Sequence, residues 1–240
     1  MSAPIDSLGA TASLGAPPGW RASPVWHGFV RAAGSAWFLL LGLMVLRVAF
    51  GTSHGAGAGV GAGGWADLLA KLCIASFYLA LWVLILIRPA PRAQAIGVLP
   101  TLMAFLGTYL PWALPLLPAG HPPASVQLLS AAMLLGGGSL VLFTVLHLGR
   151  SFSLVPQARG LVRSGPYRLI RHPLYLAEEI SVLGAALHFW SLWAVALVLV
   201  HFAIQVRRMI FEEELLSSIF SEYPAYAAAT PRLFPKFWKS

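Results

Sequence analysis

The sequence predicts an all-α, polytopic integral membrane protein, and three observations lead to this fold class. Of its 240 residues, 58% are hydrophobic and only 10% are charged, whereas soluble domains have about 25% charged residues. The hydrophobic residues form runs of about twenty, the length that a helix needs to cross a bilayer. Short polar segments separate these runs. We therefore expect four transmembrane helices and a C-terminal helical hairpin, which together give five to six membrane segments.

The first half of the chain is predicted to hold a tail and the four spans. Residues 1–28 are rich in Ala, Ser, Gly and Pro, show no period, and are expected to form a mobile tail. Residues 29–148 are expected to contain the spans, at 29–50, 66–87, 95–117 and 124–148. Pro100, Pro111 and Pro115 predict that the third span is kinked or broken, because proline interrupts helical hydrogen bonding.

The second half, residues 149–240, begins with a polar stretch and continues into the hairpin. The arms of the hairpin are predicted at residues 174–187 and 193–210, and the first arm is shorter than a full span. A charged, amphipathic segment follows and is expected to form a cytoplasmic C-terminal helix.

The distribution of charge predicts the orientation. Basic connections alternate with uncharged ones along the chain, so the positive-inside rule places both termini and the polar stretch in the cytoplasm. Arginine is much commoner than lysine, and alanine and glycine are abundant. This composition favours a GC-rich bacterial source and hence the bacterial inner membrane.

The same composition argues against several other classes of protein. The net charge of +8 comes from residues between apolar runs, which fits contact with anionic lipid rather than nucleic acid. A single cysteine, Cys73, excludes an internal disulfide and a multi-cysteine metal site. Histidines such as His201 lack ligand spacing to carboxylates, so we expect no metal site.

Polar side chains concentrate in residues 149–179, which contain five arginines, one histidine, two tyrosines and two glutamates. The His-Pro pair at His172 disfavours helical geometry there, and the next helix carries Tyr175 and Glu178 on one face, three residues apart. Carboxylates in an apolar segment usually line a cavity or site. The alternative is a cytoplasmic loop whose arginines serve only to set topology.

A second cluster, Arg207 to Glu214, lies where the last apolar helix ends. Arg208 and Glu212 are four residues apart and therefore share a helix face. The alternative is a solvated helix end with intrahelical ion pairs, which would give the same sequence pattern.

Four blocks in order carry a resemblance to a known family: GRSFS, LVRSGPYRLIRHPLY, EEELLSSIF and YPAY, within residues 147–235. They resemble the isoprenylcysteine carboxyl methyltransferase family and its bacterial relatives, which share their catalytic half with phospholipid methyltransferases. The resemblance implies an α-helical membrane enzyme with S-adenosylmethionine as methyl donor, bound at a cytoplasmic cofactor site in residues 149–240. Sulfonium methyl transfer mainly requires that donor and acceptor be aligned and water removed, so no metal is needed.

The resemblance and the residue pattern together give a set of candidate residues. The cofactor-binding candidates are Gln157, Arg159, Gly160, Leu161, Val162, Tyr167, His172, Pro173, Leu174, Tyr175, Glu178 and Glu212. Arg208 and Glu213 are the catalytic candidates. Carboxylates suit the amino group and ribose hydroxyls of the cofactor, and Arg208 suits an anionic acceptor.

The expected activity is therefore methyl transfer to a hydrophobic or lipid-like acceptor, either the carboxylate of a prenylcysteine-like compound or a lipid amine. The expected partners are this acceptor and membrane lipids, without nucleic acid, and the oligomeric state stays open. Two alternatives remain: an NADPH-dependent membrane reductase of the sterol type, and a non-enzymatic membrane module such as a transporter.

Overall fold

The computed structural model describes residues 13–14, 24–51 and 62–235. Most of the predicted tail, residues 1–28, therefore lies outside the described residues, as does the final segment of the chain. The first helix begins at Pro24, before the predicted start at Phe29.

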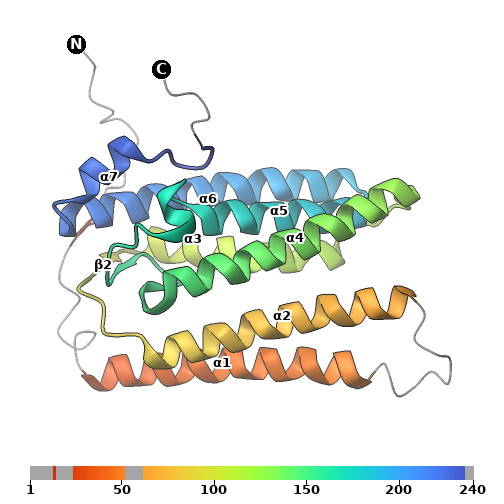
Figure 1. Ribbon diagram of the computed structural model, residues 1–240, viewed down its shortest axis with the longest axis horizontal. Helices are drawn as coiled ribbons and strands as arrows, with labels where there is room; N and C mark the ends of the chain where they lie inside the picture. The colour runs from red at the N-terminus through yellow and green to blue at the C-terminus, as the bar shows by residue number, and fades with distance from the viewer. Residues whose placement is uncertain (1–12, 15–23, 52–61, 236–240) are drawn as a thin grey trace, which may run out of the picture.

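Helices make up most of the described chain, as predicted (Figure 1). The α-helices are α1 (Pro24–Gly51), α2 (Ala62–Ile87), α3 (Val98–Tyr109), α4 (Ala124–Leu148), α5 (Pro173–Phe189), α6 (Leu192–Ile219) and α7 (Tyr223–Ala229). Short 3₁₀ helices are η1 (Leu110–Leu116), η2 (Gly149–Ser151) and η3 (Gly165–Arg168), and the strands are β1 (Ser13–Leu14), β2 (Ala93–Ile96) and β3 (Gln157–Ala158).

Several of these helices have the length and composition of membrane spans. Within the described residues, four segments qualify: Gly28–Phe50, Val98–Leu116, Ala124–Ser151 and Leu192–Ile219. A shorter apolar stretch, Ile74–Ile87, belongs to α2. Large apolar side chains are exposed along these helices, as on Leu40, Leu146 and Leu199. Such surfaces are stable in lipid and not in water, so this is an integral membrane protein.

The third predicted span is broken where its prolines fall. The α-helix α3 ends at Tyr109, and the chain continues as the 3₁₀ helix η1, with Pro111 near its start and Pro115 inside it. Pro100 lies in the first turn of α3, where its missing amide hydrogen removes no helical bond. The predicted break is confirmed, and it lets α3 and η1 both pack against α6.

The predicted C-terminal hairpin is formed by α5 and α6. Its second arm is longer than expected, because α6 continues past Ile210 to Ile219. The charged residues from Arg207 to Glu214 therefore belong to the same continuous helix as the apolar arm. A rigid helix thus carries them back toward the first turns of α5.

A small antiparallel sheet, in the order β1-β2-β3, was not expected from the sequence. In it, Ala93 pairs with Ala158 and Gln94 with Gln157, while Ser13 pairs with Ile96. Strands this short leave too few residues for an alternating pattern to appear in the sequence. The sheet joins the polar stretch to the segment that follows α2.

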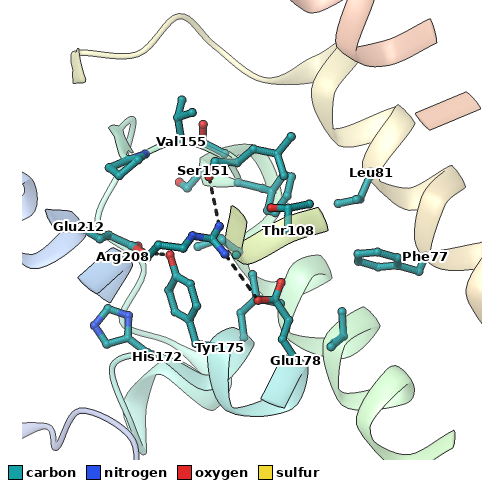
Figure 2. A pocket seen from close by; sticks show the side chains of 18 of the residues that line it. Phe77, Leu81, Thr108, Ser151, Val155, His172, Tyr175, Glu178, Arg208 and Glu212 are labelled. Carbon is teal, nitrogen blue, oxygen red and sulfur yellow. Dashed lines mark hydrogen bonds and ion pairs between the residues drawn. The ribbon is translucent and has the colours of Figure 1, made fainter. Parts of the chain in front are cut away.

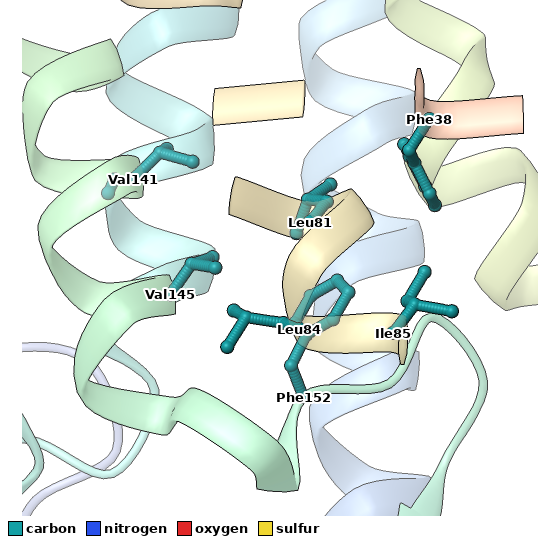
Figure 3. Packing of buried hydrophobic residues seen from close by; sticks show 8 residues of the cluster. Phe38, Leu81, Leu84, Ile85, Val141, Val145 and Phe152 are labelled. Carbon is teal, nitrogen blue, oxygen red and sulfur yellow. The ribbon is translucent and has the colours of Figure 1, made fainter. Parts of the chain in front are cut away.

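The α1–α2 hairpin is fastened to the rest of the molecule by an apolar cluster (Figure 3). Its buried members are Phe38, Leu81, Leu84, Ile85, Val141, Val145, Phe152 and Ala177. They come from α1, α2, α4 and α5 and from the turn after η2. The cluster therefore holds the α1–α2 hairpin and the helices α4 and α5 against the beginning of the polar stretch.

Two glycines allow α4 and α5 to approach closely. A Cβ atom on Gly137 of α4 would lie 2.8 Å from the backbone nitrogen of Ser181. On Gly184 of α5 it would lie 2.9 Å from Cβ of Met133. The Ser130 hydroxyl donates a hydrogen bond of 2.7 Å to the Gly184 carbonyl oxygen. Small residues at such contacts are a general device for packing helices in lipid.

We predict that Gly137→Ala destabilises the protein by about 1–3 kcal/mol, because the added methyl group forces α4 away from α5. Gly136→Ala is the matched control, because a Cβ atom there meets nothing within 4 Å. Thermal unfolding in one detergent would compare the two. Equal midpoints for both variants would show that this interface is not tight.

Candidate functional site

A cavity of about 450 Å³ lies between the α1–α2 hairpin and the helices α3 to α6 (Figure 2). One end is polar and is lined by Arg171, His172, Tyr175, Glu178, Arg208 and Glu212, among others. The other end is apolar, and its lining includes Phe38, Leu41, Ile74, Phe77, Leu81 and Val141. The volume is in the range of small-molecule sites, about 300–1,000 Å³.

His172 is held at the polar end by a carboxylate and by the backbone. Its Nε2 lies 2.8 Å from Oε1 of Glu213. Arg232 donates two hydrogen bonds to the same carboxylate, from Nε to Oε1 at 3.0 Å and from Nη2 to Oε2 at 2.6 Å. Nη1 of Arg171 is 3.2 Å from the same carboxylate. The backbone amides of Arg171 and His172 donate to the carbonyl oxygens of Pro231 and Arg232.

Glu213 is not among the residues that line the cavity. Its carboxylate is occupied by three basic side chains, which places it behind His172 rather than beside a bound molecule. Glu213, which was predicted to be catalytic, thus contacts His172 and lies outside the lining of the cavity.

Tyr175 and Glu212 meet across the hairpin. The Tyr175 hydroxyl, from α5, donates a hydrogen bond of 3.0 Å to Oε2 of Glu212 on α6. The guanidinium carbon of Arg208 lies 5.1 Å from the centre of the Tyr175 ring, within the range of a cation–π contact. Residues from the two polar clusters of the sequence therefore form one group (Figure 2).

Arg208 is 5% exposed and is fixed by a short polar network. Its Nη1 donates to Oε1 of Gln205 at 2.7 Å, and its Nη2 donates to the carbonyl oxygen of Leu154 at 3.2 Å. Gln205 in turn donates to Glu178 at 2.7 Å. The buried Nε of Arg208 has no partner among the described residues. A rigid guanidinium in the cavity wall thus keeps a donor free.

The close approach of α3 makes this arrangement possible. At Gly107 a Cβ atom would lie 2.6 Å from Cδ and 2.7 Å from Nη1 of Arg208. Only glycine leaves room for the arginine to lie against α3.

A further buried pair, His201 and Glu179, was missed in the sequence. Nδ1 of His201 lies 2.8 Å from Oε1 of Glu179, and its Nε2 lies 2.9 Å from the Gly107 carbonyl oxygen. Both ring nitrogens thus lie close to oxygen atoms, and the imidazole forms a close pair with the Glu179 carboxylate. The pairing of His201 with Glu179 was not expected from the sequence, because α5 and α6 bring together residues distant in sequence. His201 and Glu179 both lie in apolar helices, where an ionisable side chain usually has a partner, and this feature of the sequence could have indicated the pair.

Tyr167 adds a second free polar group to the cavity wall. Its hydroxyl is buried and has no partner among the described residues. Burial, reinforced by the charges of Glu212 and Glu178, raises its pKa well above the usual value. The hydroxyl therefore stays protonated and is able to donate a hydrogen bond. The Tyr226 hydroxyl fixes this segment by donating 2.6 Å to the Tyr167 carbonyl oxygen.

Most of the other predicted cofactor residues also line the cavity. They are Gln157, Gly160, Leu161, Val162 and Leu174. Pro173 is not among the lining residues, and it starts α5 directly after His172.

Arg159, predicted to bind the cofactor, is also not among the residues that line the main cavity. Its Nε donates to the carbonyl oxygen of Pro89 at 2.9 Å, and its Nη2 donates to Oε1 of Gln157 at 2.6 Å. Burial, together with the nearby charges of Arg88 and Arg31, lowers its pKa to about 10. The sheet turns this side chain outward, toward the end of α2.

Comparison with known proteins gives three matches. Residues 126–223 match the family model described as phospholipid methyltransferase. The chain is 40% identical over 77 residues to the cobalt-zinc-cadmium resistance protein CzcN of Cupriavidus metallidurans. This match covers 32% of this chain and 36% of that protein. It is 31% identical over 122 residues to the nickel-cobalt-cadmium resistance protein NccN of Alcaligenes xylosoxydans xylosoxydans, covering 49% and 56%.

The matched segments thus span between about a third and just over half of these two relatives. The family match runs from α4 through the start of α7 and includes His172, Tyr175, Arg208 and Glu212. Over residues 126–223, this integral membrane protein carries a domain that matches the phospholipid methyltransferase family.

Proposed function

We propose that the protein is a membrane methyltransferase that uses S-adenosylmethionine to methylate a hydrophobic, lipid-like acceptor. The observation that carries this proposal is the cavity itself. One continuous space has carboxylate, imidazole and guanidinium groups at one end and apolar side chains from the spans at the other. A polar donor and a lipid-like acceptor are the pair of molecules that such a space suits. The family match over residues 126–223 supports it.

The polar end has groups that fit the methyl donor. Glu212 offers a carboxylate for an amino group or for ribose hydroxyls, and Tyr175 holds that carboxylate in place. His172 and the free hydroxyl of Tyr167 are suitable hydrogen-bonding partners for the cofactor's carboxylate or adenine. The sulfonium supplies an activated methyl group, and the residues around it bind, orient and exclude water.

Arg208 suggests which acceptor is used. Arg208 lines a cavity that continues into apolar surface, and its buried Nε has no partner among the described residues. An acidic group at the end of a hydrophobic chain would satisfy this donor and the apolar lining together. A lipid amine would bring a second positive charge close to Arg208. We therefore favour a hydrophobic carboxylate, of the prenylcysteine type, over a lipid amine.

The orientation proposed from the loop charges agrees with this placement. The arginine-rich polar stretch, β2 and α7 lie at the same end of the molecule (Figure 1). We place that end in the cytoplasm, with the protein in a bacterial inner membrane. Both matched relatives come from bacteria.

The two alternatives receive less support. The family match favours methyl transfer over a sterol-type reductase and over a non-enzymatic module. The printed names of the relatives refer to metal resistance. The described residues hold no group of three or more metal-ligating side chains.

We predict that Glu212→Gln lowers the affinity for S-adenosylhomocysteine at least about tenfold, because a charge-assisted hydrogen bond contributes about 1.5–3 kcal/mol. Glu214→Gln is the matched control, since Glu214 is exposed two residues further along α6. Isothermal titration calorimetry in detergent would measure both. Wild-type affinity in the Glu212 variant would remove this residue from the cofactor site.

We predict that Arg208→Gln lowers kcat for a hydrophobic carboxylate acceptor about a hundredfold, with a smaller change in cofactor affinity, because a preorganised charge is lost from the site. Arg207→Gln is the control, since the neighbouring Arg207 lies over the Phe211 ring and does not line the cavity. Transfer of a tritiated methyl group would give the rates. Unchanged turnover in the Arg208 variant would refute its role toward the acceptor.

A further inference from the structure

A second, smaller cavity of about 30 Å³ lies beside the end of α2. Its charged lining consists of Arg31 from α1, Arg88 directly after α2, and Arg159 after β3. Gln157 lines both this cavity and the large one. The small cavity is therefore a separate feature that shares one wall with the proposed methyl-transfer site.

Among the described residues, no acidic side chain compensates the charges of the three arginines. Within the described parts of the chain, no carboxylate lies within 4.0 Å of Arg31, Arg88 or Arg159. Burial lowers the pKa of Arg88 and Arg159, and the neighbouring arginine charges lower both pKa values further. A protein that gathers three like charges around one cavity is poised to accept an anion there.

Arg159 is prepared for such an anion. It is only 8% exposed, and two of its nitrogens are held by Pro89 and Gln157. Its third nitrogen, Nη1, is buried and has no partner among the described residues. A buried, unsatisfied donor costs about 1–3 kcal/mol, more when it is charged, and an anion in the small cavity would satisfy it.

The cavity lies where lipid headgroups are expected. Arg31 is near the start of the span Gly28–Phe50, and Arg88 follows the last residue of the apolar stretch Ile74–Ile87. Both positions mark the boundary of the hydrocarbon layer. The volume admits about two water-sized atoms, so phosphate oxygens enter while the rest of a headgroup stays outside.

We propose that Arg31, Arg88 and Arg159 form a binding site for a phosphate anion, carried by the headgroup of an anionic membrane lipid. The site lies outside the methyl-transfer cavity, and the proposal does not depend on methyl transfer. Arginine suits phosphate because its planar group donates two parallel hydrogen bonds.

The test compares two double variants of the full chain in detergent. Arg31→Gln/Arg88→Gln removes two charges from the cavity and leaves the bonds of Arg159 in place. Arg163→Gln/Arg168→Gln removes two exposed charges from the same polar stretch, and neither residue lines either cavity. Native mass spectrometry would follow titration with phosphatidylglycerol or phosphatidylcholine, and competition by inorganic phosphate.

We expect the wild type to prefer phosphatidylglycerol, and the cavity variant to bind it at least about tenfold more weakly, as loss of charge-assisted bonds implies. The control should change less than about twofold. A third outcome is that the protein binds inorganic phosphate without preferring phosphatidylglycerol, and that only the cavity variant loses this binding. The site would then stand, but its ligand would be a soluble anion rather than a lipid headgroup. Equal losses in both variants would mean general charge attraction, and no loss in either would mean no site; both results overturn the proposal. Affinity for S-adenosylhomocysteine, measured in parallel, tests the methyl-transfer proposal independently.

Discussion

The carboxylate of Glu213 is the contact on which the polar end of this protein depends. It joins three segments: the His-Pro turn before α5, the helix α6, and the chain after α7, through His172, Arg171 and Arg232. A buried charge is tolerable only when its partners are all present. Once this cluster forms, the position of His172 is fixed, and the first turns of α5 must lie against α6. Tyr175 and Glu212 then meet as a consequence.

The hairpin of α5 and α6 explains why a polar network is able to exist inside an apolar bundle. Glu178 and Glu179 on α5 face Gln205, Arg208 and His201 on α6, so each charged group has a partner in the neighbouring helix. In a low-dielectric environment these pairs fix geometry more strongly than they would in water. Glycines at the contacts, Gly107 beside Arg208 and Gly137 beside Ser181, bring the helices close enough for the network to close.

The sequence was sufficient to predict the helical membrane fold, the break in the third span and the hairpin, because each follows from local properties such as run length and proline position. It also singled out Tyr175, Glu178, Arg208 and Glu212, which the structure brings to one cavity, since polar groups are conspicuous in an apolar chain. It did not reveal the partnership of His201 with Glu179, which arises only when two helices pack.

The short sheet escaped prediction for a related reason, and so did the contacts of Arg159 with Pro89 and Gln157. Nothing local to β3 shows that it pairs with β2 and turns Arg159 toward Pro89. The apolar part of the cavity was equally hidden, because Phe38 and Phe77 look like any lipid-facing residue until the helices are assembled.

The side chain of Gln157 lies between the two cavities and lines both of them. Its side-chain oxygen accepts from both Ser153 and Arg159, and its nitrogen donates to Gln94. An occupant that pulls on Arg159 therefore acts on an amide that also faces the larger cavity. Thermodynamic linkage is reciprocal, so any such effect runs in both directions. The proposed methyl transfer would then depend on the anionic lipid content of the membrane around the protein.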